Sequence, residues 1–256
     1  MPEAAVRLLQ RVVIALQAGQ QQQELMQLAL TLASTNQAEL TALLVEDENL
    51  AQLMRLPFAQ EVQRLSASVQ ALDNSAWDRR KRRQAEHIRQ QLQQIAQQHG
   101  LPTSLQITRG PYLTEVLRIA HTHDAIFLTG QHATRQILQR PTAPRPVWVL
   151  LDNSGQSLQA LHIGLALCQS GRYQLRPVLE AQSLAAHTVS APIADLLHQT
   201  SPAGTALVMP ELKLAPLLTA LNRQAVGLLI MPQALLATDT ELSVLEKVPC
   251  PVLLIQ

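Results

Sequence analysis

Four consecutive residues offer the polar groups best suited to hold a ligand: Asp152, Asn153, Ser154 and Gly155, which follow an apolar run directly. Acidic and hydroxyl side chains at the carboxyl end of a buried strand stand where open α/β sheets place nucleosides and phosphates. The same side chains also suit the N-cap of a following helix, because they accept hydrogen bonds from its free N–H groups. A ligand corner and a helix cap both follow from this pattern, and the cap is the simpler interpretation.

The densest positive charge is the run Arg79-Arg80-Lys81-Arg82-Arg83. Such a run is typical of a patch for nucleic acid, acidic lipid or an acidic partner. Five consecutive residues wrap more than one helical turn, so they form no single stripe, and a solvated helix face is the simpler interpretation. Aromatic residues make up 2% of the chain and the net charge is +1. We therefore expect no nucleic-acid partner.

Signatures of the common enzyme classes do not occur in the sequence. It has no Gly-x-Ser-x-Gly elbow, no phosphate loop ending in Gly-Lys-Ser/Thr, no Gly-x-Gly-x-x-Gly turn and no His-Glu-x-x-His helix. The carboxylates of Glu46-Asp47-Glu48 have no evident base beside them. Cys168 and Cys250 lie in apolar patterns without metal-ligand spacing, which indicates buried free thiols in a reducing compartment. We expect no catalysis, no metal and no cofactor.

Short, almost continuously apolar runs alternate with longer amphipathic stretches along the chain. Apolar runs of this length are typical of strands buried on both faces of a parallel sheet, and apolar residues at helical spacing are typical of the covering helices. This alternation predicts an α/β fold with a doubly wound, mostly parallel sheet of about nine strands. The strand candidates are Val12–Leu16, Thr41–Val45, Ala125–Leu128, Val147–Leu151, Val226–Ile230 and Val252–Ile255, and helical spacing occurs within Leu25–Leu32, Leu113–Ala120 and Leu158–Cys168.

An internal repeat relates the two parts of the chain. A shift of about 135 residues superimposes apolar positions across strand, helix and strand without a gap, for example Val12 on Val147 and Leu40 on Leu175. Later the shift falls to about 102, because the second copy lacks a segment near residues 47–100 that we expect to form two helices or one broken long helix. We predict one repeat at residues 1–145, with this Gln- and Arg-rich insert, and a shortened repeat at 146–256.

These repeats are expected to pack as an internal pseudo-dimer. The proline-rich residues 140–146 run directly into Val147–Leu151, which the repeat register makes the first strand of the second copy. The first copy is thereby left without a fifth strand. A single continuous sheet would contradict the division into two separately packed sheets.

Several of these segments resemble universal stress proteins. Gly110-Pro111, then Val116, Leu117 and Ala120, then residues 124–130 (Asp-Ala-Ile-Phe-Leu-Thr-Gly) are similar to a characteristic stretch of that family, and residues 249–255 (Pro-Cys-Pro-Val-Leu-Leu-Ile) are similar to its closing strand. The resemblance covers most of the chain and is weakest in the middle of the second copy. It implies two Rossmann-like repeats of the adenine nucleotide alpha hydrolase-like type with parallel sheets, which either bind ATP or have lost it.

ATP-binding members carry Gly-x2-Gly-x9-Gly-Ser/Thr after the fourth strand, where backbone N–H groups and a hydroxyl approach phosphate. Of these positions the first copy keeps Gly130 and replaces the others with Ala133, Ala143 and Pro144. In the second copy these positions hold Pro232, Leu235 and Leu245. An acidic residue after the first strand contacts the nucleoside in the family. The remnant site that the resemblance implies comprises Gln17, which replaces this acid in the first copy, and Val45, Gly110, Gly130, Asp152, Asn153 and Ser154.

Two functions remain open on this evidence. The chain is expected to be a non-catalytic stress-response or regulatory protein that has lost ATP binding and acts through contacts with an unknown protein partner. The alternative is a sensor of an adenine nucleotide or another small molecule, with Asp152 and Gly130 as surviving anchors. The absence of a leader-like or membrane-spanning apolar run predicts a cytoplasmic location without a membrane partner. A homodimer is a further possibility that the sequence leaves open.

Overall fold

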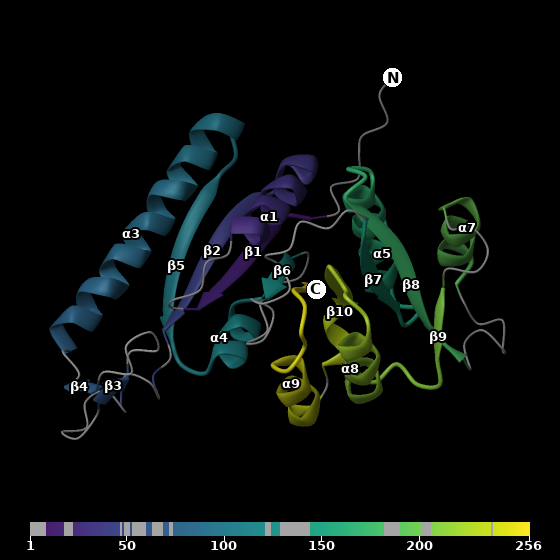
Figure 1. Ribbon diagram of the computed structural model, residues 1–256. Helices are drawn as coiled ribbons and strands as arrows, with labels where there is room; N and C mark the ends of the chain where they lie inside the picture. The colour runs from purple at the N-terminus through teal and green to yellow at the C-terminus, as the bar shows by residue number, and fades with distance from the viewer. Residues whose placement is uncertain are drawn as a thin grey trace.

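A computed structural model describes residues 9–17, 23–46, 48, 52, 60–62, 69–71, 74–120, 124–128, 144–181, 190–200, 206–236 and 238–256. Its centre is one nine-stranded sheet with the order β5-β2-β1-β6-β11-β10-β7-β8-β9 (Figure 1). The strands are β1 (Arg11–Gln17), β2 (Glu39–Glu46), β5 (Thr103–Arg109), β6 (Asp124–Leu128), β7 (Arg145–Leu151), β8 (Tyr173–Glu180), β9 (Leu207–Met209), β10 (Leu228–Pro232) and β11 (Val252–Ile255).

Helices cover both faces of this sheet, which confirms the predicted α/β fold class. One face packs against α1 (Gln23–Asn36), α3 (Asn74–His99), α5 (Gly155–Cys168) and α7 (Ala191–Thr200). The other packs against α4 (Tyr112–Ile119), α8 (Leu214–Arg223) and α9 (Asp239–Leu245). A short 3-10 turn, η2 (Gln233–Leu235), follows β10. Because both faces are covered, β6 and β10 are buried at every residue, and they read as apolar runs apart from Asp124 at the start of β6.

Two groups of strands have the same internal order. We call β5-β2-β1-β6 half one and β9-β8-β7-β10-β11 half two. In half one Val12 pairs with Leu40, and in half two Val147 pairs with Leu175, so both pairs of first strands keep the register that the sequence shift predicts. All pairs within each half are parallel.

An antiparallel pair, β6 with β11, joins the two halves into one sheet. The sheet is therefore continuous, and the expectation of two separately packed sheets is wrong. The physical reason is that half one ends on β6, whose outer N–H and C=O groups need partners. β11 supplies them while pairing with β10 on its other side, so it closes half two and covers the open edge of half one.

The insert between β2 and β5 differs from its prediction. Gln60–Val62 (β3) and Val69–Ala71 (β4) form a two-stranded antiparallel sheet rather than helix. The C-terminal part of the insert is one unbroken helix, α3, of 26 residues. Its apolar residues Ile88, Leu92 and Ile95 recur at helical spacing and are buried against the sheet, which explains why one long helix forms here.

Candidate functional site

Three of the predicted site residues in half one meet at the carboxyl edge of the sheet. Gln17 ends β1 and pairs in register with Val45 of β2. Gly110 follows β5, and its N–H donates to the carbonyl of Glu46 at 3.1 Å. The fourth residue, Gly130, lies outside the described residues, as do Ala133 and Ala143. The backbone therefore brings Gln17, Val45 and Gly110 together, as a ligand site there requires.

Side chains from α3 reach this edge and engage its polar groups. Gln84 Nε2 donates to the carbonyl of Gln17 at 3.2 Å. Lys81 Nζ and Arg109 Nε both lie near the same carboxylate oxygen of Glu46, at 3.2 and 3.1 Å. The insert thus supplies internal partners where a bound ligand would otherwise compete. Sequence reasoning missed these contacts, because Lys81 and Glu46 are 35 positions apart.

Gly110 has an explanation within the fold. Its φ of +146° belongs to a region that L side chains rarely adopt, and a Cβ added there would lie 2.9 Å from Glu115 Cγ. Glu115 approaches because its carboxylate accepts hydrogen bonds from Arg118 and from the Thr108 hydroxyl. The hydrogen bond from Arg118, followed by that from Thr108, lowers the pKa of Glu115. The close approach of a side chain therefore accounts for this glycine.

In half two the predicted ligand corner forms the N-cap of α5. Ser154 Oγ accepts a hydrogen bond from the Ser157 N–H at 3.2 Å. The Asp152 carboxylate accepts from the Ser154 N–H at 3.0 Å and from the Ser157 hydroxyl, and the Asp152 N–H donates to the Ser157 hydroxyl at 2.8 Å. Each of these polar groups has a partner within the same turn, which is what a helix cap requires.

Asn153 completes this corner by holding a second helix. Its backbone has a φ of 66°, a conformation that Asn tolerates better than most residues. Its side-chain oxygen accepts from the Ser190 N–H at 3.3 Å, immediately before α7.

At Asp152, burial raises the pKa, but hydrogen bonds from Ser154 and Ser157 outweigh this and the resulting pKa is lowered.

In half two, residues with structural roles occupy the positions that correspond to the phosphate loop. Pro232 ends β10, Leu235 lies in η2, and Leu245 is a buried core residue of α9. Proline offers no N–H, and a buried leucine has no path to a phosphate. In half one Pro144, at the hydroxyl position, lies immediately before β7.

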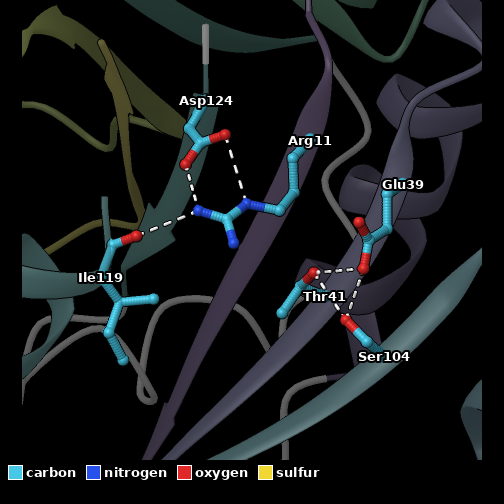
Figure 2. Close-up of polar contacts among 6 residues, drawn as sticks. All are labelled: Arg11, Glu39, Thr41, Ser104, Ile119 and Asp124. Carbon is cyan, nitrogen blue, oxygen red and sulfur yellow. Dashed lines mark hydrogen bonds and ion pairs between the residues drawn. The ribbon is translucent and has the colours of Figure 1, made fainter. Parts of the chain in front are cut away.

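A polar cluster that the sequence reasoning missed lies at the opposite edge, where the strands of half one begin. Figure 2 shows the Arg11 guanidinium beside the carboxylate of Asp124, with a further hydrogen bond to the Ile119 carbonyl at 3.0 Å. The side chains are 15% and 3% exposed. The sequence signal for this ion pair is a charged residue immediately before each of two apolar runs, whose strands are neighbours in the sheet. Glu39 nearby accepts from the hydroxyls of Thr41 and Ser104.

Neither cysteine is activated. Burial raises the pKa of Cys168 to about 11 and that of Cys250 to about 12, so both thiols are protonated near neutral pH. Within the described part of the chain, no three His, Cys, Asp or Glu side chains gather in a way that could hold a metal ion. No helix of the same part is long and apolar enough to cross a bilayer.

Solved structures with this fold include two universal stress proteins. One, from Pseudomonas aeruginosa, has a TM-score of 0.52 at 11% identity, with 97% of this chain and 94% of that chain covered. The other, from Archaeoglobus fulgidus, has a TM-score of 0.50 at 11% identity, with 96% of each chain covered. No family model matches the sequence, and no curated protein matches it. The chain therefore shares the fold of universal stress proteins over nearly its whole length.

Proposed function

We propose that this chain is a universal-stress-type regulatory protein of the cytoplasm that has lost ATP binding, is not an enzyme, and acts through protein contacts. The observation that carries the proposal is the state of the carboxyl edge, where the fold places its ligands. In half one Gln84 and Lys81 of the insert contact Gln17 and Glu46. In half two the Asp152 carboxylate serves the cap of α5.

The free energies of the missing hydrogen bonds support the proposed loss of ATP binding. Each missing backbone approach or hydroxyl removes a charge-assisted hydrogen bond worth roughly 1.5 to 3 kcal/mol. Two or three such losses weaken a micromolar site to about millimolar or beyond. Displacing Lys81 from Glu46 would add a further cost, because it would separate an ion pair whose two side chains are 18% and 14% exposed.

The non-enzymatic part of the proposal is supported by how the reactive groups are used. The Glu46 and Glu115 carboxylates each contact basic side chains, and Asp152 accepts from Ser154 and Ser157. A general base works best with a pKa near the operating pH, and a nucleophilic thiol must be deprotonated. The lowered pKa of Glu115 and of Asp152 makes these carboxylates weak bases, and the protonated thiols of Cys168 and Cys250 are poor nucleophiles.

A second candidate function is a small-molecule sensor in half two. Gln156 lies in the first turn of α5, and Gln233 follows β10, which neighbours β7 in the sheet. The side-chain oxygens of both are buried and have no hydrogen-bond partner. Buried acceptors of this kind are costly unless satisfied, so a ligand with N–H donors, such as adenosine, would stabilise them.

Native mass spectrometry of the purified protein tests the two candidates together. The proposal predicts a subunit mass without any bound nucleotide, and the same spectrum reports the number of subunits. An added mass equal to adenosine or another small molecule, lost in Asp152→Ala, would favour the sensor. A stoichiometric ATP adduct would contradict the proposal outright.

A further inference from the structure

Helix α3 concentrates the positive charge of the molecule. Six of the 20 Lys and Arg residues of the chain lie on it with two acidic residues, Asp78 and Glu86, so its formal charge is +4 where the whole chain carries +1. The rest of the molecule is thus net acidic. Charge separated in this way produces a local field that the small net charge of the chain conceals.

The fold fixes which side of α3 faces water. The buried stripe of Ile88, Leu92 and Ile95 packs on the sheet, and α3 lies along the outside of the edge strand β5 (Figure 1). The basic residues on the other sides of the helix are exposed: Arg79, Arg80, Arg82 and Arg83. They stand on a packed helix rather than on a loop, so a partner would not have to order the backbone beneath them.

This placement does not help the helix itself. The first turn of α3 contains no acidic residue, and five consecutive cations follow in its N-terminal half. Neighbouring like charges on one helix repel each other. This repulsion destabilises α3, and binding of an anion would relieve it.

Among the described residues, carboxylates of the chain pair with some cations of this region and leave two exposed arginines of α3 without an ion pair. Glu46 is shared between Lys81 and Arg109, and Glu86 pairs with Arg89. Within the described ranges, no carboxylate forms an ion pair with Arg82 or Arg83. Positive charge therefore remains available at Arg82 and Arg83.

Three classes of anion could bind such a surface, and the neighbouring side chains favour a protein. A membrane would need exposed apolar residues on α3, but its apolar stripe is already buried on the sheet. Bound single strands usually stack on aromatic rings, and the exposed residues described on α3 include no Phe, Trp or Tyr. Beside α3, Ile107 of β5 is 49% exposed and lies on the same strand face as Arg109. An apolar side chain flanked by cations suits a peptide.

We infer that the exposed face of α3, with Ile107 and Arg109 of β5, is the docking surface for an acidic segment of a partner protein. This inference rests on the proposed function, since it names the surface through which protein contacts would be made. Acidic side chains of the partner pair with the arginines of α3, and an apolar side chain of the partner contacts Ile107.

Fluorescence anisotropy with a labelled poly-glutamate peptide tests this surface in the full-length chain. The test variant carries Arg79→Gln, Arg80→Gln, Arg82→Gln and Arg83→Gln, which keep helix-forming side chains and leave the Lys81 contact with Glu46 in place. A matched control changes four exposed cations of half two, Arg172, Lys213, Arg223 and Lys247, to Gln. Circular dichroism checks that both variants keep their helices.

The inference predicts salt-dependent binding that the α3 variant weakens about tenfold or more, as four lost exposed ion pairs would. The control should change the affinity by less than about twofold, because its cations are scattered. Equal weakening by both variants, or no binding at low salt, would overturn the inference. So would tighter binding, at physiological salt, of single-stranded DNA or of phosphatidylserine vesicles.

This result is separable from the proposed function. A nucleotide adduct in native mass spectrometry together with intact peptide binding would reject the loss of ATP and keep the surface. No nucleotide and no peptide binding would reject the surface alone. The contribution of Ile107 is tested with a poly-glutamate peptide that carries a single leucine. Ile107→Ser should weaken the binding of this peptide more strongly than the binding of the leucine-free peptide. Equal effects on both peptides would mean that Ile107 is not part of the docking surface.

Discussion

The two halves of the sheet share a strand order but hold their strand ends by different means. Half one joins the starts of β1 and β6 with the Arg11–Asp124 ion pair, and the repeat register puts Pro146 and Val226 at these positions in half two. At the carboxyl edge, half one uses Lys81 and Gln84 from a distant helix, whereas half two uses a local cap.

This comparison distinguishes the apolar residues that define the fold from the polar contacts at the strand ends. Apolar runs recur in both halves at the same register and build the same parallel order. Polar contacts at the strand ends do not recur, so they are alternative ways to satisfy groups that each half exposes. The two halves therefore satisfy the polar groups of the same edge differently, by side chains of a distant helix in half one and by a local cap in half two.

The largest expected effect concerns the joint between the halves. Phe127 of β6 is fully buried and pairs with Leu253 of β11. Phe127→Ala should lower the free energy of unfolding by about 4 kcal/mol, because it leaves a cavity where the halves meet. Urea unfolding measures it, with Val208→Ala, half-exposed on β9, as a control expected to change by less than about 0.5 kcal/mol. A loss below about 1 kcal/mol for Phe127→Ala would mean that the joint is not tightly packed.

The next effect concerns the ion pair present in half one alone. Asp124→Asn leaves the Arg11 charge, 15% exposed, without its counter-charge and should destabilise by about 3 kcal/mol. Half two has uncharged residues at both positions. Replacing both residues of half one with apolar ones, by Arg11→Met and Asp124→Val, should recover most of the lost stability, because no unpaired charge remains. Glu86→Gln, which breaks an exposed pair, should cost less than about 0.5 kcal/mol. A double variant as unstable as Asp124→Asn would contradict this account.

A smaller effect is expected at the cap of half two. Ser154→Ala removes the acceptor for the Ser157 N–H and should cost about 1 kcal/mol in thermal or urea unfolding. Ser243→Ala, an exposed position in α9 whose hydroxyl donates to a backbone carbonyl, serves as the control and should be nearly neutral. If Ser154→Ala were neutral as well, the corner would not be acting as a cap.

The smallest effect is a pH dependence at Asp152. Its pKa is lowered in the folded protein, so the ionised form contributes stability above the unfolded value of about 3.9, and this contribution is lost as the pH falls through the folded pKa. The stability difference between the native protein and Asp152→Asn should be constant from about pH 6 to 8 and shrink below about pH 4. A difference that grows on acidification would reverse the sign and refute the assigned hydrogen bonds.

Much of this fold could be predicted from its apolar runs, and the reasons for the failures are physical. β1, β2, β6, β7 and β11 are buried along most or all of their length, so each contains an apolar run that the sequence shows. β5 was missed because it lies at the edge and alternates polar with apolar residues. β10 begins at Leu228, two residues later than predicted. The strands 60–62 and 69–71 have three residues each, too few for the sequence to show a period, and the insert was predicted as helix.

The candidate site was predictable only where it is local. Asp152, Asn153 and Ser154 carry a cap pattern that the sequence shows within a few residues. Gln84 reaches Gln17 across 67 positions, and Arg11 reaches Asp124 across 113, distances that one sequence cannot relate. The fold brings such residues together, so the covering of the carboxyl edge by α3 became visible only in the structure.

Titration calorimetry with ATP on the native protein is the decisive test of the proposed loss of ATP binding. We predict a dissociation constant of about a millimolar or weaker, since Ala133, Ala143 and Pro144 stand where ATP-binding members carry two glycines and a hydroxyl. A variant with Lys81→Ala and Gln84→Ala, which uncovers Glu46 and Gln17, should gain little, because the loop residues stay lost. Micromolar ATP binding by the native protein would contradict the account.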